Sequence, residues 1–283
     1  MPLPPTPLPA FRKTIGQVLR TGLNSSFEAT APPAAARAVR LDCRGGFDAP
    51  TAGLAPGAVQ ANLVVVPRAA AFDFARFCLL NPRPCPLLAV SDDGFALGGD
   101  LRTDLPRYLV WRDGAVAEER SDVADLWTDD MVGFLLGCSF SWEGRLEAAG
   151  LTPRHVEQKR NVPMYRTAVP NARAGPFGGS LVVSMRPYAE NDVAAVAAAT
   201  APFPAAHGAP VHWGDPAAIG VGDLGAPDFG DAVELRPGDV PVFWACGVTP
   251  QSALAAAALP LCVTHAPGHM FVCDLVDEAL RVV

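Results

Sequence analysis

Two histidines near the end of the sequence, His265 and His269, are four residues apart in the segment THAPGHMFVCD (264–274). On a helix this spacing would place both imidazoles on one face, as in zinc peptidase motifs. Pro267 and Gly268 lie between them, however, and neither residue favours a helix interior. We therefore expect a loop between two short strands that directs both imidazoles into one cavity. Because histidine titrates near neutral pH, one ring could act as a base and the other as an acid.

A second polar segment, HGAPVHWGDPAAIGVGDLGAPDFGD (207–231), adds more groups that can transfer protons. The predicted catalytic set is His265, His269, His212 and Asp215. The same side chains could hold a divalent metal such as zinc or magnesium. Aspartates in such a loop could also serve only to form turns, and histidines are often structural. We expect acid–base chemistry without a cofactor, with a divalent metal as the alternative.

An anionic substrate would need local cationic and polar groups, because the protein as a whole is acidic. Guanidinium groups bind carboxylates bidentately, so Arg102 and Arg186 are the predicted anchors. The other candidates for substrate binding are Asn161, Tyr165, Ser139 and Cys246. The segment GCSFSWE (137–143) departs from the nucleophile motif G-x-S-x-G, since Ser141 occupies the final glycine position. A helix end with a buried thiol and capping serines is the alternative interpretation of this segment.

Composition narrows the class of protein and of partner. The chain has 22 basic and 29 acidic residues and a formal net charge of -7, which argues against nucleic acid as the main partner. Half of the residues are apolar and 18% are charged, as in a globular protein. We expect a small anionic carboxylate as substrate. A homo-oligomer is compatible with the sequence.

The cysteines and the hydropathy pattern predict the compartment. There are seven cysteines, an odd number without a CxxC pair, which is typical of reduced thiols. Residues 1–13 lack the apolar core of a secretory signal, and no apolar run is suited to cross a bilayer. We therefore expect a cytoplasmic protein with no membrane association.

The elements that must position these side chains can be predicted from hydrophobic periodicity. Short apolar runs predict strands at 60–67, 86–90, 180–187 and 240–247, and on both sides of the histidine loop. Helical spacing predicts helices at 11–22, 69–80, 128–137, 190–200 and 249–259, the last capped by Thr249 with Pro250 in its first turn. An Asp-Gly pair within 108–119 predicts a hairpin.

This alternation of strands and helices predicts an α/β fold, with a mixed sheet flanked by helices. We expect one unit of 283 residues. Its main domain would comprise about 10–120 and 200–283, and a smaller α+β subdomain would be inserted at about 120–200.

Eight segments together resemble a known family. They are NPRPCPLL, DLRTDLPRY, GCSFSWE, NVPMYRT, AGPFGGSLVVSMRP, HGAPVHWGDP, PVFWACGVTPQ and THAPGHMFVCD. In this order they are similar to the D-glutamate cyclase family, whose bacterial members are named hydro-lyases. The resemblance implies an α/β fold particular to the family, no known cofactor, and conversion of D-glutamate to 5-oxo-D-proline and water. A metal-dependent hydrolase or isomerase, or a non-catalytic carboxylate-binding protein, are the alternatives.

Overall fold

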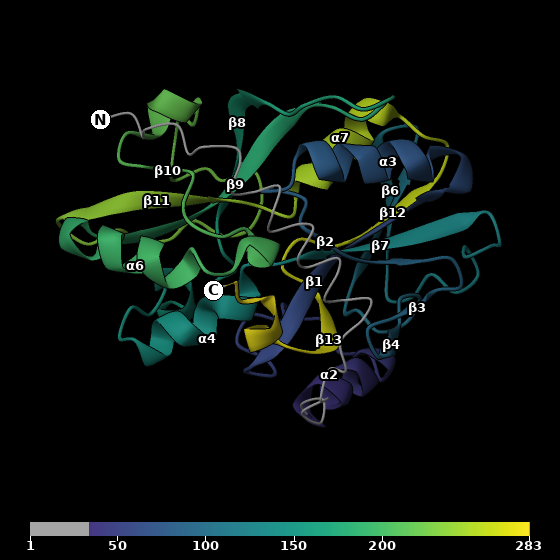
Figure 1. The fold of residues 1–283 in the computed structure, drawn as a ribbon, viewed down its shortest axis with the longest axis horizontal. Coiled ribbons are helices and arrows are strands. Elements are labelled where there is room, and N and C mark those ends of the chain that lie inside the picture. The colour runs from purple at the N-terminus through teal and green to yellow at the C-terminus, as the bar shows by residue number, and fades with distance from the viewer. Residues whose placement is uncertain (1–33, 283) are drawn as a thin grey trace.

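The computed structural model describes residues 34–282. Its largest element is a seven-stranded sheet in the order β2-β7-β1-β12-β5-β6, with β13 also paired to β1 (Figure 1). Its strands are β1 (Ala58–Pro67), β2 (Leu87–Ser91), β5 (Tyr108–Arg112), β6 (Ala115–Arg120), β7 (Met131–Gly137), β12 (Cys262–His265) and β13 (Phe271–Val276). This sheet forms the half of the molecule shown on the right in Figure 1.

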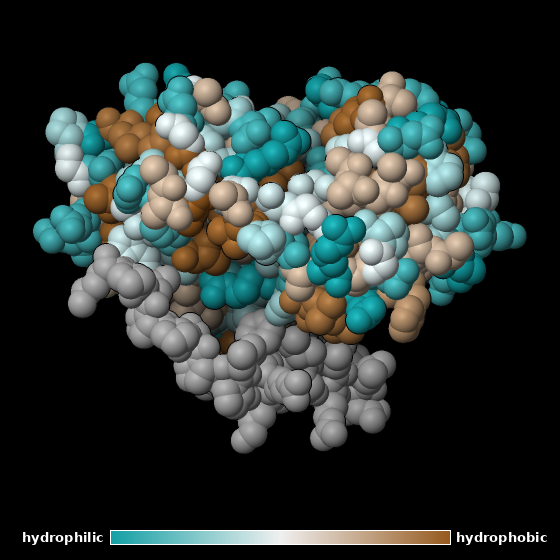
Figure 2. Space-filling view, turned by 90° about the horizontal axis from the view of Figure 1, so that it is seen from above, coloured by the Kyte–Doolittle hydropathy of each residue, from teal (hydrophilic) through white to brown (hydrophobic). Residues whose placement is uncertain are grey.

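A four-stranded sheet in the order β10-β11-β9-β8 forms the other half. Its strands are β8 (Met164–Pro170), β9 (Ser180–Ala189), β10 (His212–Trp213) and β11 (Asp239–Ala245). Two short strands, β3 (Phe95–Ala96) and β4 (Gly99–Asp100), make a separate hairpin. In the space-filling view of Figure 2, an indentation in the upper outline separates two halves, and hydrophilic and apolar residues alternate over the surface.

Helices cover both sheets. They are α2 (Ala34–Arg44), α3 (Arg68–Leu80), α4 (Phe140–Ala148), α5 (Arg154–Glu157), α6 (Val193–Thr200) and α7 (Thr249–Ala257). Four 3-10 turns complete the described elements: η1 (Glu190–Asp192), η2 (Pro204–Ala206), η3 (Pro216–Ile219) and η4 (Asp277–Leu280). Helices α3 and α7 pack on the same side of the large sheet, where their apolar residues share one cluster with β1 and β7 (Figure 1).

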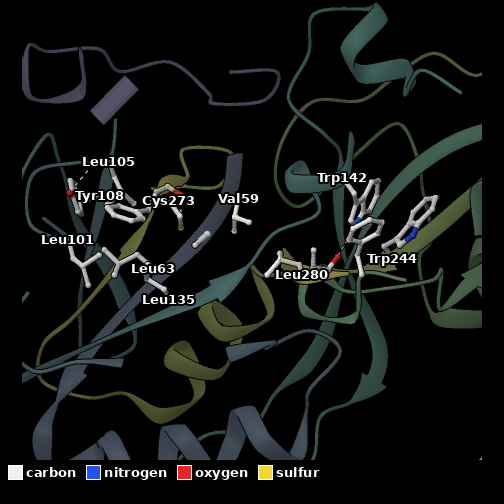
Figure 3. Close-up of a cluster of buried hydrophobic side chains, with 14 of the residues drawn as sticks. Val59, Leu63, Leu101, Leu105, Tyr108, Leu135, Trp142, Trp244, Cys273 and Leu280 are labelled. Carbon is white, nitrogen blue, oxygen red and sulfur yellow. Dashed lines mark hydrogen bonds between the residues drawn. The ribbon is translucent and has the colours of Figure 1, made fainter. Parts of the chain in front are cut away.

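Strand β1 is buried on both faces, which explains its uninterrupted apolar sequence. Leu63 and Val65 belong to one core cluster, whereas Val64 and Val66 belong to another. The first cluster extends to Trp142 of α4 and Trp244 of β11, so it joins the large sheet to the small one (Figure 3). The two halves therefore share a continuous core.

The fold class predicted from the sequence is confirmed, since helices flank more than one sheet and there is no barrel among the described residues. Each described strand pair is antiparallel, however, rather than part of a mixed sheet. The predicted strands and the Asp113-Gly114 hairpin are present. Asp113 and Gly114 both have positive φ, as a tight hairpin turn requires.

Two local predictions are wrong. The segment 128–137 contains β7 instead of a helix, because MVGFLLG lies between β1 and β2 with every residue buried, and such a run lacks a distinguishing period. Thr249 does not cap α7; its hydroxyl hydrogen bonds with the backbone of Val182 instead. Pro250 does lie in the first turn of α7. The predicted helix at 11–22 lies outside the described residues.

The small sheet overlaps the subdomain expected at 120–200 but is displaced toward the C-terminus. It begins at Met164 and ends at Ala245, whereas β7 belongs to the large sheet. The division into a main domain and an inserted subdomain stays a prediction.

Candidate active site

A break in the large sheet creates the candidate site. One edge of β1 pairs with β12 at Val64 and Val65, and with β13 from Ala58 to Ala61. Between these two ladders, the chain leaves the sheet after His265 and returns at Phe271. The imidazole of His265 fills part of the gap, with its Nδ1 3.2 Å from both the backbone nitrogen and the backbone oxygen of Leu63.

A cavity opens beside this break, bounded by both sheets and by the segments that precede two helices. It encloses about 300 Å³ of empty space, including its mouth. Its polar walls comprise Asn62, Ser139, Ser184, His207 and His265, and its thiols are those of Cys138 and Cys246. Most of the remaining walls are apolar, which matches the usual composition of a small-molecule site.

His265 is a buried group of this cavity with unused hydrogen-bonding capacity. It is fully buried, and its Nε2 has no hydrogen-bond partner among the described residues. Burial lowers its pKa to about 4, so the ring is neutral at pH 7. Because Leu63 presents both a donor and an acceptor to Nδ1, either neutral tautomer is stabilised. Nε2 can therefore act as a proton acceptor or as a donor.

His207 has a tautomer fixed by its surroundings. Its Nδ1 lies 2.7 Å from the carbonyl oxygen of Arg83, which can only accept, so Nδ1 carries the proton and Nε2 the lone pair. Burial lowers its pKa to about 4, despite the opposing effect of the Arg83 carbonyl. The backbone of His207 has φ +76°, an unfavourable conformation for a non-glycine residue that is concentrated at functional sites.

A buried ionic network supports one wall of the cavity. The guanidinium of Arg186, fully buried between Trp142 and Trp244, donates from Nε to Glu143 at 2.9 Å. Nε2 of His155 lies 3.2 Å from the same carboxylate. Burial alone would raise the pKa of Glu143, but the charges and hydrogen bonds of His155 and Arg186 outweigh it and hold the pKa at about 2. Glu143 is therefore an ionised structural partner.

The guanidinium of Arg186 also donates to two serine hydroxyls, although its Nη2 is shared with Glu143. Nη1 donates to Ser184 Oγ at 3.0 Å, and Nη2 donates to Ser139 Oγ at 2.9 Å. Both serines line the cavity. Arg186 thus reaches the cavity through the hydroxyls of Ser139 and Ser184.

The two cysteines are poor nucleophile candidates. Cys138 and Ser139 lie between strand β7 and helix α4, which corrects the expectation that this segment follows a helix. Burial raises the pKa of Cys138 to about 12 and that of Cys246 to about 11. Since the thiolate is the reactive form, neither side chain is activated at neutral pH.

Comparison with known proteins assigns this chain to a family. A model described as D-glutamate cyclase matches residues 132–274. A protein of Bordetella pertussis named "putative hydro-lyase" is 58% identical over 85% of this chain and 90% of its own length. A Rubrobacter xylanophilus protein of the same name is 56% identical over 88% of this chain and 99% of its own length. One from Jannaschia sp. is 50% identical over 91% of this chain and 97% of its own length. The chain belongs to the D-glutamate cyclase family.

In this family member, the other predicted catalytic residues lie outside the cavity wall. His269 is buried in the loop after His265, and its two ring nitrogens each lie 3.1 Å from a carbonyl oxygen, of Pro267 and of Asp48. Burial lowers the pKa of His269, although both carbonyls favour the charged ring. His212 contacts the Asp215 carbonyl at 2.8 Å, and the Asp215 carboxylate accepts from the Ala217 amide. These contacts stabilise a local turn. The four predicted catalytic residues therefore do not meet in one cavity, which corrects the expectation from the sequence.

Of the residues predicted to bind the substrate, some line the cavity and others do not. Ser139 and Cys246 line the cavity, whereas Arg186 lies behind it. Arg102 pairs with Asp100 at 2.7 Å near the surface, and Tyr165 donates to the Leu224 carbonyl. Asn161 donates to the Pro267 carbonyl, which places it beside the loop that carries His269.

The polar residues of the site and its support that were absent from the predicted set are Asn62, Glu143, His155, Ser184 and His207. Asn62 donates to the carbonyl of Gly137 at 2.8 Å, which ties β1 to the end of β7. Asn62 and Ser184 each lie in a stretch of mostly apolar residues, QANLVVV and LVVSM, whereas Glu143 directly follows the buried Trp142. A polar residue within a buried strand or helix must have a specific partner, and that signal could have identified them.

Two general findings concern residues 34–282. No group of three or more histidine, cysteine, aspartate or glutamate side chains in this part is arranged to hold a metal ion. Across the same residues, no helix combines the length and apolarity needed to cross a membrane.

Proposed function

We propose that this protein is a hydro-lyase that closes D-glutamate to 5-oxo-D-proline in the cavity beside His265. Membership of the D-glutamate cyclase family supports the reaction type. The unpartnered Nε2 of the fully buried His265 is the observation that supports the location. A buried polar atom without a partner costs free energy, so a group that binds it in the functional complex would explain its retention.

The chemistry requires proton transfer between two atoms of the substrate. The amino nitrogen attacks the γ-carboxyl carbon, a carbon–nitrogen bond forms, and one carboxyl oxygen leaves. An ammonium nitrogen loses two protons on becoming the lactam nitrogen, and the departing oxygen takes up two protons and leaves as water. A group that accepts protons from nitrogen and returns them to oxygen therefore accounts for the whole balance.

His265 is our candidate for this role because its ring is neutral at pH 7 and the residue lines the cavity. Its lowered pKa leaves Nε2 or Nδ1 free of a proton at pH 7, and Leu63 accepts either tautomer. His207 Nε2 supplies a second lone pair on the cavity wall. We propose that these two imidazoles share the proton transfers without a metal or other cofactor.

The reaction is tested by incubating the purified protein with D-glutamate, L-glutamate and a panel of hydroxy acids, followed by mass spectrometry. Loss of one water from D-glutamate, with 5-oxo-D-proline as product, is the expected result. Failure of every compound to lose water would end the hydro-lyase proposal. Repeating the assay with a chelator, and after addition of zinc or magnesium, tests the alternative of metal dependence.

The location is tested with two matched variants. His265→Gln should reduce turnover by about 10²-fold or more, because it removes the proposed proton carrier. His269→Gln, four residues away, should keep turnover within a few-fold, because that ring contacts only carbonyls. The reverse order would place the chemistry at His269. Melting curves of both variants control for folding.

A further inference from the structure

The hydroxyls of Ser139 and Ser184 have a fixed direction that follows from the chemistry of arginine. Arg186 has only donors, so both serine oxygens must accept from it. Neither hydroxyl proton has an acceptor in the hydrogen bonds of residues 34–282. Since both side chains line the cavity, each can donate its proton to a ligand there.

The position of Arg186 is held from every side. Its guanidinium stacks over Trp142, with Cζ 4.9 Å from the ring centre, and over Trp244 at 5.4 Å. Glu143 neutralises its charge at Nε, and His155 packs against that carboxylate. A guanidinium so enclosed cannot turn toward a substrate, but it can hold two hydroxyls in place.

The electrostatics of this wall favour a negative ligand. Helix α4 begins directly after Ser139, and α7 begins directly after Val248, which also lines the cavity. The amino-terminal end of a helix carries a partial positive charge. Together with two hydroxyl donors, these ends favour a carboxylate over a neutral group.

We propose that Ser139 and Ser184 bind the α-carboxylate of the substrate, with Arg186 as a positioning residue that orients both hydroxyls. This inference rests on the proposed function for the identity of the substrate, and adds which group is bound and by what. An independent sign of a ligand in the same cavity is the buried, unpartnered Nε2 of His265. The α-carboxylate would lie against the serines and the reacting γ-carboxyl near the imidazole.

The test measures binding and turnover separately. Calorimetry with two probes reports binding without chemistry. 5-Oxo-D-proline retains only the α-carboxylate, and glutarate has no amino group and cannot form the lactam. Ser139→Ala and Ser184→Ala should each weaken binding by about 10-fold or more, the usual effect of removing a hydrogen bond to a charged group. In turnover of D-glutamate, KM should rise by a similar factor while kcat changes little.

Ser141→Ala is the matched control. Ser141 is buried in α4, two residues after Ser139, but its hydroxyl donates to the Gln60 carbonyl and it does not line the cavity. Its variant should bind both probes as the wild type does.

The outcomes separate this inference from the proposed function. Weaker binding in both cavity variants supports the carboxylate site even if D-glutamate is not turned over. Equal binding in wild type and variants, or no binding of either probe to the wild type, overturns it even if water is lost from D-glutamate. A fall in kcat with unchanged KM and unchanged product binding also overturns it, because the hydroxyls would then act on the reacting carboxyl.

Discussion

Acid should destabilise this protein through two buried histidines. His207 and His265 each have a pKa of about 4 in the folded protein, against an ordinary value of 6.5. Between these values the unfolded chain binds a proton that the folded protein does not. The stability contributed by each neutral ring is therefore present above pH 6.5 and is lost as the pH falls toward 4.

The magnitude follows from the size of the shift. A pKa change from 6.5 to about 4 corresponds to about 3 kcal/mol once the pH is below both values. On lowering the pH from 7 to 5, linkage predicts that each ring reduces the free energy of unfolding by about 2 kcal/mol. Both side chains are almost completely buried, so solvent screening does not reduce this value much.

Urea denaturation at pH 7 and pH 5 measures this loss. His207→Gln and His265→Gln should each lose about 2 kcal/mol less than the wild type between the two pH values, because glutamine does not titrate. Acidic groups contribute equally to all the proteins and cancel in the comparison. Ser141→Ala, a buried substitution that removes no titrating group, should follow the wild type. If the histidine variants lose as much stability as the wild type, the argument that these rings are held neutral by burial is refuted.

Two further predictions concern the support of the cavity. Glu143→Gln should lower the free energy of unfolding by about 3–5 kcal/mol, measured by urea denaturation, because the charge of Arg186 loses its buried partner; a loss below about 1 kcal/mol would contradict this role. Gly247→Ala should reduce substrate binding in calorimetry, since a Cβ there would clash with Asn62 Nδ2, whereas Gly144→Ala in α4, with open space around it, should not. Equal binding in both glycine variants would contradict the close approach of β1 to this turn.

Much of the secondary structure could be predicted because it depends on neighbouring residues. The hairpin at Asp113-Gly114 follows from two residues that tolerate positive φ. Helix α3 was predictable from the helical spacing of the apolar residues in 69–80. Strand β7 could not be distinguished from a buried helix, because seven buried positions in succession remove the alternation that identifies a strand.

The candidate site was predictable only in part. His265, Ser139 and Cys246 were identified and do meet at one cavity. His212 was grouped with them because polar residues cluster along the sequence, yet its ring stacks on Phe243 in the small sheet. Arg186 was chosen as a direct anchor, but nothing in its local sequence reveals that Glu143 neutralises it.

By itself, the sequence determined the class of fold, the positions of most strands and helices, and the family. Those properties follow from local propensities, hydrophobic periods and segments of continuous similarity, which are all visible along one chain. Tertiary structure alone decided which polar side chains share a cavity. That outcome depends on β12 and β13 dividing one edge of β1, and on β7 and β11 delivering two helix starts from different sheets. Such contacts join residues far apart in the chain, and no local pattern encodes them.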